Sequence, residues 1–192
     1  MLLFKKIFMI RLFDLFLSAL ALILLSPLIL LVYFLINIEN KSPFFLQERV
    51  GKYGKIFILI KFRTMSIGTK SCATHLVDSS SITRLGNILR KTKIDEIPQL
   101  INVLKGQMSL VGPRPCLPSQ KELISLRSKY NLYEFLPGIT GLAQINRIDM
   151  SDPVFLSETD YKMMKNLNIY KYFYYLVMTL FGKGLGDRVK AL

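Results

Sequence analysis

The apolar residues of this chain are concentrated in one long run near its N-terminus. Residues 12–38 are almost wholly apolar and are interrupted by only a few polar side chains, among them Asp14 and Ser18. Because a helix rises about 1.5 Å per residue, such a run can reach across a hydrocarbon core of roughly 30 Å. It is too long for a cleaved signal peptide, and no small-residue cleavage site follows it. The pattern therefore predicts a segment that is retained in a membrane.

The dipeptide Ser26-Pro27 lies in the middle of this apolar run. Proline removes one backbone hydrogen bond and clashes with the preceding turn, so a sharp bend is expected there. Basic residues flank the run on both sides, whereas a spanning helix has an excess of Lys and Arg on one side. A re-entrant hairpin fits this pattern better than a spanning helix. Arg11 and Asp14 are three residues apart and can pair at the membrane interface.

Beyond this run, strand-like and helical patterns alternate. Two runs rich in β-branched and aromatic residues, 44–51 and 55–63, predict a hairpin whose connection contains glycine. The polar residues 66–81 and the Gly/Pro-rich residues 106–118 are expected to be loops, and 136–147 a run of turns with one strand-like portion. Helical patterns cover four stretches: 82–91, about 95–105, 120–130 and about 157–181. The sequence thus predicts a helix-rich α/β fold with a small sheet.

These patterns divide the chain into two parts that work as one unit. Residues 1–40 are expected to anchor the chain in the membrane, and residues 41–192 to form a cytosolic domain at the membrane interface. The predicted helix 157–181 interleaves tyrosines with lysines, which suits the headgroup region of a membrane. An ordinary helix with one core-facing side explains the same pattern equally well. The expected architecture therefore includes interfacial amphipathic helices, with a core helix as the alternative.

The formal net charge of +13, beside 51% hydrophobic residues, indicates a polyanionic partner. Nucleic acid, an anionic membrane surface and phosphorylated substrates would each explain it. The basic residues form no recognisable reading helix or RNA-binding motif, which argues against nucleic acid. Cys72 and Cys116 lack a metal-ligand spacing and are interpreted as reduced thiols of a cytosolic domain, and His75 as a loop residue.

Two adjacent carboxylates, Asp95 and Glu96, lie at the predicted start of the helix 95–105. Pro98 is tolerated in a first turn but not inside a straight helix, which puts that start near Asp95. The simplest interpretation makes Asp95 the N-cap, with Glu96 complementing the helix dipole. Four basic residues crowd upstream of the pair: Arg84, Arg90, Lys91 and Lys93. A cap alone does not explain them, whereas a site that handles phosphate and a divalent metal does.

An ordered set of short motifs extends over nearly the whole chain. They are Arg11-Leu-Phe-Asp14, Ser26-Pro27, Gln47-Glu-Arg-Val-Gly51, Lys61-Phe-Arg-Thr-Met65, Thr83-Arg-Leu-Gly86, Leu89-Arg-Lys91, Asp95-Glu-Ile-Pro-Gln-Leu100, Asn102-Val-Leu-Lys-Gly106, Met108-Ser-Leu-Val-Gly-Pro-Arg-Pro115 and Pro137-Gly-Ile-Thr-Gly141. Any one motif is weak, but their order and spacing are highly specific. The chain resembles the bacterial sugar-transferase family, the monotopic phosphoglycosyl transferases that begin membrane-linked glycan assembly, in their minimal catalytic form.

The resemblance implies a re-entrant membrane helix bent at Ser26-Pro27, with a catalytic region that faces the cytoplasm at the bacterial inner membrane. It implies transfer of a sugar-1-phosphate from a UDP-sugar to undecaprenyl phosphate, with release of UMP and a requirement for Mg²⁺. The matching Asp95 would be the nucleophile that forms an aspartyl-phosphosugar intermediate. Glu96 would be its partner, either as a metal ligand beside Asp95 or in helping the polyprenyl phosphate to attack. The competing interpretations are the same family fold with another donor or a lost activity, a membrane scaffold, and a nucleic-acid-binding protein.

Guanidinium groups match phosphate oxygens, so basic residues in the motifs are candidates to bind the diphosphate. Five are expected to do so: Arg90, Arg114, Arg147, Lys61 and Arg63. The chain departs from the family pattern after Asn146, because the glycine that often precedes the matching arginine is absent. The resemblance therefore does not fix the direction of the Arg147 side chain. No residue identifies the sugar.

Overall fold

The computed structural model describes residues 2–68 and 81–183. Its α-helices are α1 (Leu2–Leu24), α2 (Ser26–Asn40), α3 (Arg84–Thr92), α4 (Gln99–Leu104), α5 (Lys121–Lys129), α6 (Leu142–Ile145), α7 (Pro153–Asn166) and α8 (Ile169–Leu180). Its strands are β1 (Phe44–Val50), β2 (Ile56–Phe62), β3 (Ser109–Val111) and β4 (Gly138–Thr140). Short 3₁₀ turns occur at η1 (Lys52–Gly54), η4 (Ile94–Glu96) and η5 (Leu132–Glu134). The predicted helix-rich α/β fold with small sheets is confirmed. Most of the predicted loop 66–81, with Cys72 and His75, lies outside the described residues.

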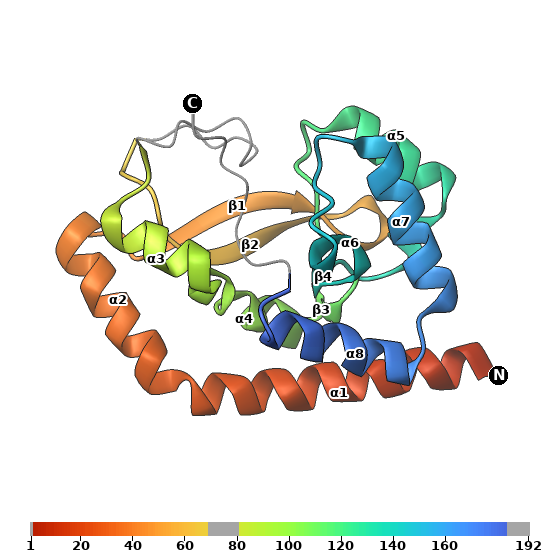
Figure 1. Cartoon of the computed structure of the whole chain (residues 1–192), viewed down its shortest axis with the longest axis horizontal. Coiled ribbons are helices and arrows are strands. Elements are labelled where there is room, and N and C mark those ends of the chain that lie inside the picture. The colour runs from red at the N-terminus through yellow and green to blue at the C-terminus, as the bar shows by residue number, and fades with distance from the viewer. Residues whose placement is uncertain (1, 69–80, 184–192) are drawn as a thin grey trace.

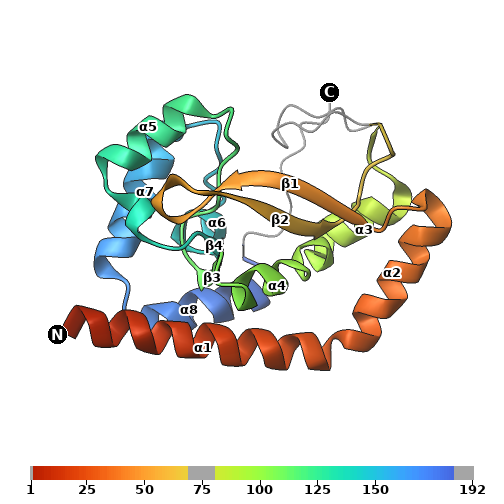
Figure 2. The same cartoon turned by 180° about the vertical axis from the view of Figure 1, so that it is seen from behind.

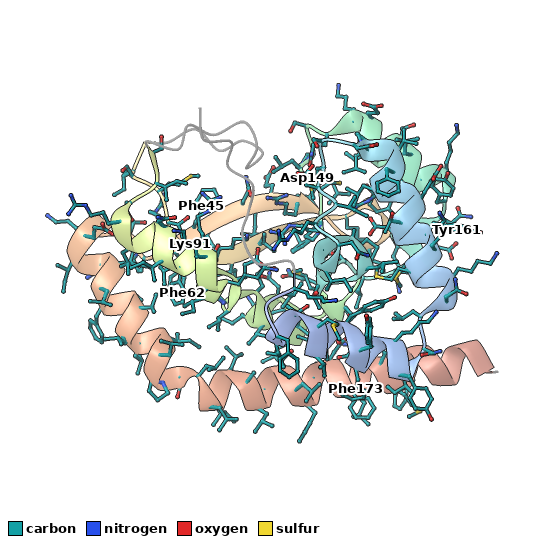
Figure 3. All side chains as sticks on the ribbon, in the orientation of Figure 1. Phe45, Phe62, Lys91, Asp149, Tyr161 and Phe173 are labelled. Atoms are coloured by element: carbon teal, nitrogen blue, oxygen red, sulfur yellow. The ribbon has the colours of Figure 1, made fainter. Side chains whose placement is uncertain are left out.

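Helix α1 runs along one edge of the molecule, and α8 lies beside it (Figures 1 and 2). Helix α4 lies between α1 and the hairpin β1–β2, and α5 packs against α7 at the end where α1 begins. The rings of Phe13 in α1 and Phe173 in α8 meet edge to face, with their centroids 5.1 Å apart (Figure 3). The main core lies between these layers, where β2, α4, β3, α7 and α8 contribute buried apolar residues.

The two strands β1 and β2 form the antiparallel hairpin that the sequence predicts. Gln47 lies opposite Leu59 in its register, and the connection η1 contains Gly54 with a φ of 71°. Helix α4 is attached to the outer edge of β2 by the Asn102 side chain. Its Oδ1 accepts the N–H of Ile60 (3.0 Å), and its Nδ2 donates to the carbonyl of Ile58 (2.7 Å). The amide of Asn102 thus continues the hydrogen-bond ladder and fixes the hairpin to the helix.

The apolar run forms two helices, α1 and α2, with a sharp bend between them. Ser26 Oγ donates to the carbonyl of Ile23 (2.8 Å) beside Pro27, which confirms the predicted break. Among the described helices, none is long and apolar enough by itself to cross a membrane. The arms Phe8–Leu24 and Ser26–Glu39 pass that test only together, and they are bent by 63°.

Both arms of this bent pair pack on the same domain. Helix α1 places Phe13 and Leu17 against the main core. Helix α2 returns to the hairpin, where Val32 and Ile36 are buried in a cluster with Phe62 of β2 and with α3. The opposite sides of both helices are apolar and exposed. Such residues are Phe8, Leu12, Phe16, Ile23, Leu24, Leu30, Leu31, Phe34 and Ile38.

Asp14 lies inside the protein, which corrects its predicted position at the membrane edge. Only 1% of its surface is exposed. Its Oδ1 accepts hydrogen bonds from Ser109 Oγ (3.1 Å), Leu110 N (2.9 Å) and Tyr172 Oη (2.8 Å). Nη1 of Arg11 lies 3.7 Å from its Oδ2. A buried carboxylate needs such partners to offset its lost hydration. Asp14 therefore ties α1 to β3 and α8.

The predicted helix 95–105 begins differently from the expectation. Lys93 has a φ of 58°, and its carbonyl accepts the N–H of Glu96 (3.0 Å), so the chain forms the turn η4 before α4 starts at Gln99. Asp95 lies inside this turn and is not an N-cap.

Two other expectations are also corrected. The predicted helix 157–181 is the two helices α7 and α8, because Leu167 is extended and the Asn168 side chain accepts the N–H of Lys171 to start a new helix. Strand β3 lies within the predicted loop 106–118, because it pairs in parallel with β4. That pairing is long-range, so local composition does not reveal it.

Candidate active site

The two carboxylates Asp95 and Glu96 lie in the turn η4, which α3 and β2 both contact. Only 6% and 7% of their respective surfaces are exposed. Two adjacent buried carboxylates are costly unless cations or hydrogen bonds compensate their charge. The cations and hydrogen-bond donors around this turn therefore determine whether the two carboxylates are ionised.

Two cations from distant parts of the sequence contact Glu96. Lys61 Nζ in β2 lies 2.7 Å from Oε1 of Glu96, and Arg114 Nη2 lies 2.6 Å from the same oxygen. Burial alone would raise the pKa of Glu96, but the charges of Arg114 and Lys61 hold this pKa well below its usual value of 4.5. Glu96 is thus ionised at neutral pH. Lys61 Nζ also lies 4.0 Å from Oδ2 of Asp95, so it serves both carboxylates.

The backbone of β2 holds Lys61 in this position. The neighbouring residue Ile60 donates its N–H to Asn102, which is fully buried in α4. Helix α4 in turn follows directly on the turn η4 that carries Asp95 and Glu96. The side-chain amide of Asn102 therefore fixes the distance between strand β2, which carries Lys61, and the turn η4.

The loop that carries Arg114 is held by its own carbonyl groups. The five consecutive carbonyls from Gly112 to Cys116 each accept a hydrogen bond. The donors are, in order, Gln144 Nε2 (3.4 Å), Gly138 N (2.8 Å), Arg127 Nη1 (2.7 Å), Arg49 Nη1 (3.0 Å) and Val50 N (2.9 Å). Pro113 and Pro115 restrict the backbone further, because each fixes φ and has no N–H to satisfy. This loop therefore presents Arg114 to Glu96 in a preorganised conformation.

Close backbone packing between β3 and β4 supports the Arg114 loop. A Cβ atom on Gly138 would lie 2.0 Å from the backbone nitrogen of Gly112, and one on Gly112 would lie 2.6 Å from the carbonyl oxygen of Leu136. Only glycine permits this approach, which lets β3 and β4 pair directly before the Arg114 loop.

The other predicted phosphate contacts lie in different settings. Arg90 is half-buried in the last turn of α3, just before the carboxylate turn. Arg63 donates from Nε to the Ser42 carbonyl (3.0 Å) and from Nη2 to Ser42 Oγ (3.2 Å), so its guanidinium supports the start of β1. Arg147 is exposed and has a φ of 58°. It thus adopts the left-handed backbone conformation that a glycine would take without strain.

The carboxylates of this site can be compared with the ligands that the predicted Mg²⁺ needs. In the part of the chain that the structure describes, no group of three or more His, Cys, Asp and Glu side chains can hold a metal ion. Asp95 and Glu96 supply hard oxygen ligands, and Mg²⁺ is commonly bound by one or two carboxylates together with substrate phosphates. These residues fit a metal ion that binds with a diphosphate, and do not fit one held by protein ligands alone.

Sequence reasoning missed the buried pair Arg127–Asp160 behind the Arg114 loop. Nη2 of Arg127 lies 2.6 Å from Oδ2 of Asp160, and the two residues are 2% and 0% exposed. The sequence contained a signal for this pair, because each charged residue stands at a position in the apolar stripe of its helix. Arg127 follows the buried Leu123 by one turn of α5, and Asp160 follows the buried Leu156 by one turn of α7.

The family model described as bacterial sugar transferase matches residues 5–183 of the chain. The sugar transferase EpsL of Bacillus subtilis, itself uncharacterized, is 45% identical over 71% of this chain and 67% of its own length. The UDP-glucose:undecaprenyl-phosphate glucose-1-phosphate transferase of Klebsiella pneumoniae is 43% identical over 71% of this chain and 30% of its own length.

A third relative is the UDP-N-acetylgalactosamine-undecaprenyl-phosphate N-acetylgalactosaminephosphotransferase of Aeromonas hydrophila. It is 35% identical over 82% of this chain and 39% of its own length. The chain thus spans well under half of these two named transferases. The family match, by contrast, extends through all the elements that form the carboxylate site. The chain therefore belongs to the bacterial sugar transferase family of enzymes.

Proposed function

We propose that this chain transfers a sugar-1-phosphate from a UDP-sugar to undecaprenyl phosphate at the cytoplasmic face of the bacterial inner membrane. The observation that carries the proposal is the buried Asp95–Glu96 pair with Lys61 and Arg114 as its counter-charges. The names of two relatives support the classes of donor and acceptor, because both pair a UDP-sugar with undecaprenyl phosphate. The reaction would be an early membrane step of a surface polysaccharide or glycoconjugate.

In the first step, a carboxylate oxygen of Asp95 attacks the β-phosphorus of the UDP-sugar. A bond forms between this oxygen and phosphorus, the bridging P–O bond of the diphosphate breaks, and UMP leaves with that bond's electron pair. Lys61 Nζ, 4.0 Å from Asp95, offsets the charge that otherwise repels an anionic nucleophile from a diphosphate. Arg114, whose side chain is 27% exposed, can contact phosphate while its Nη2 stays on Glu96.

In the second step, a phosphate oxygen of undecaprenyl phosphate attacks the phosphorus of the aspartyl phosphosugar. The aspartyl–phosphorus bond breaks, the Asp95 carboxylate is restored, and a polyprenyl diphosphosugar leaves. Splitting the transfer in this way lets a water-soluble nucleotide and a membrane lipid use the same nucleophile in turn. Glu96, which is adjacent to the nucleophile in the turn η4, is proposed as its partner, either as a metal ligand or in helping the polyprenyl phosphate to attack.

A divalent metal belongs to this proposal as a partner of the diphosphate. Asp95 and Glu96 would hold Mg²⁺, which when bound neutralises phosphate charge and polarises the phosphoryl oxygens. Arg90 and Arg147 are proposed as further phosphate contacts. The direct experiment is to remove Mg²⁺ with EDTA, which should abolish UMP release, and to restore it with added Mg²⁺.

The bent pair α1–α2 is proposed to enter one leaflet and return. Three observations support a re-entrant arrangement: both arms pack on the same domain, their outer sides are apolar, and the bend is 63°. Large exposed apolar surfaces of this kind are typical of lipid contact. Helix α8, which lies beside α1 (Figure 1), also has exposed apolar residues, among them Tyr170 and Leu180. A straight span would instead separate the two arms.

The topology is testable with single cysteines at residues 3 and 54, after Cys72 and Cys116 are replaced. A membrane-impermeant reagent applied to intact cells should label neither site until the membrane is opened. Labelling of residue 3 alone from outside would show a spanning helix and refute the re-entrant arrangement.

The activity is testable by measuring UMP released from a panel of UDP-sugars with undecaprenyl phosphate and Mg²⁺. One donor should support rapid release by the purified chain, and Asp95→Asn should abolish this release because an amide cannot attack phosphorus. Asp152→Asn is a suitable control, because Asp152 is the exposed N-cap of α7, where Asn serves equally well. Without acceptor lipid, release should stop after about one UMP per chain, because the first step cannot repeat until Asp95 is freed. Continued multiple-turnover release without acceptor lipid, or release that survives in Asp95→Asn, would contradict the proposal.

A further inference from the structure

The buried pair Arg127–Asp160 joins α5 to α7 behind the Arg114 loop. It is incompletely hydrogen-bonded: among the described residues, Arg127 Nε and Asp160 Oδ1 have no hydrogen-bond partner. Buried ion pairs of this kind are weak stabilisers, because an apolar replacement of similar shape is often neutral or stabilising. Fold stability alone is therefore a poor explanation for two charges at this place.

The geometry of the Arg127 guanidinium offers a better explanation. Its Nη2 contacts Asp160, while its Nη1 donates to the carbonyl oxygen of Arg114 at 2.7 Å. Arg114 in turn contacts Glu96 through its own side chain at 2.6 Å. A continuous series of contacts thus leads from Asp160 through Arg127 and Arg114 to Glu96.

The other supports of the Arg114 loop act on neighbouring residues. Arg49 holds the carbonyl of Pro115, and Val50 holds that of Cys116. Only Arg127, among the described donors to these five carbonyls, both reaches Arg114 itself and is oriented by a carboxylate. The two η nitrogens of Arg127 project in fixed directions from one planar guanidinium. One can therefore contact Asp160 while the other donates to the Arg114 carbonyl.

We propose that Arg127 and Asp160 are positioning residues that hold Arg114 in the orientation needed for phosphate binding. The proposal rests on the proposed function for the role of Arg114. Neither residue is expected to touch the substrate. Outer groups that orient the ligands of a metal ion commonly change its affinity or the activity by about 10–100-fold when replaced. We expect an effect of that size on kcat for UMP release.

Two variants separate positioning from charge. Arg127→Lys keeps a positive charge beside Asp160, but its single amine cannot present the guanidinium fork to both Asp160 and the Arg114 carbonyl. Asp160→Asn keeps an oxygen acceptor for Arg127 and removes the charge that orients it. Asp152→Asn is the matched control, because it makes the same chemical change on α7 at an exposed N-cap where Asn serves equally well.

The test is a double-mutant cycle with Arg114→Ala. Arg127→Lys and Asp160→Asn should each lower kcat about 10–100-fold in the native background and change it less than about threefold in Arg114→Ala. Asp152→Asn should be silent in both backgrounds. Equal loss in both backgrounds would mean that the pair acts independently of Arg114 and would overturn the proposal. Wild-type chain that releases no UMP from any donor would contradict the proposed function instead.

A second readout needs neither activity nor substrate. Backbone amide hydrogen exchange should become faster in the segment 109–117 of Arg127→Lys and Asp160→Asn, relative to the hairpin β1–β2 of the same variants. If exchange rises uniformly over the domain, the pair serves general stability and the proposal fails. If exchange is unchanged in 109–117, the pair does not hold the loop and the proposal also fails.

Discussion

Replacing Glu96 with Gln removes the negative charge that Lys61 and Arg114 share. Both cations lie within 2.7 Å of Oε1. Gln retains an oxygen acceptor, so the contacts become neutral-acceptor hydrogen bonds and two positive groups are left facing each other. Removing one member of a buried ion pair costs about 3–5 kcal/mol, and we take the lower value because the Arg114 side chain is 27% exposed. For a chain of this size, about 3 kcal/mol corresponds to about 6–12 °C in Tm.

The assay is thermal unfolding in detergent, followed by circular dichroism, from pH 8 to pH 3. The folded pKa of Glu96 is depressed, so its stabilising contribution is present above the unfolded value of 4.5 and is lost as pH falls through the folded pKa. The difference in Tm between wild type and Glu96→Gln should therefore be constant from pH 8 to about 5 and shrink below about 4.5. The exposed Glu48→Gln on β1 is the matched control and should unfold like wild type. A Tm of Glu96→Gln equal to that of wild type at pH 7 would refute the charge-cluster reasoning.

Other substitutions test separate parts of the structure. Asp14→Ala should destabilise the fold by about 3 kcal/mol in chemical denaturation, because three donors lose a buried acceptor. Asp14→Asn keeps an acceptor oxygen and should cost less; equal costs would contradict the role of this oxygen as an acceptor. Gly138→Ala should lower stability by about 3 kcal/mol or abolish soluble expression, because its Cβ would meet the Gly112 backbone, and wild-type stability would contradict this packing. Arg114→Ala should lower kcat/KM for UMP release about 10–100-fold, whereas exposed Lys162→Ala should change it little; equal small effects would mean that positive charge serves membrane attachment only.

The elements with local signals were predictable from the sequence. Alternating apolar residues and a glycine connection specify the hairpin, and Ser26-Pro27 specifies the bend. The end of α7 was not predictable from periodicity, because the aromatic and apolar pattern continues through Leu167 into α8. One local sign of this helix end is Asn168, a polar residue whose role as the N-cap of α8 is evident only from the structure.

The candidate site was predictable in its residue types but not in its contacts. Asp95 and Glu96 stand out as adjacent carboxylates, but local rules favour a helix cap over a charge cluster. Lys61 and Arg114 come from segments far from them in the sequence, and their meeting at one Glu96 oxygen depends on the whole fold. The same holds for Asp14, whose partners come from β3 and α8, so its neighbour Arg11 was the only partner that sequence spacing could suggest.

We propose that Asp95 carries the sugar phosphate as a covalent intermediate. The most direct measurement is intact mass spectrometry of the chain after incubation with its UDP-sugar donor and Mg²⁺, without acceptor lipid. We expect a mass increase equal to one sugar phosphate, located by peptide mapping on Asp95, absent in Asp95→Asn and discharged when undecaprenyl phosphate is added. Steady turnover by wild type with no adduct at any time, or an adduct on another residue, would contradict the assignment of Asp95 as the nucleophile.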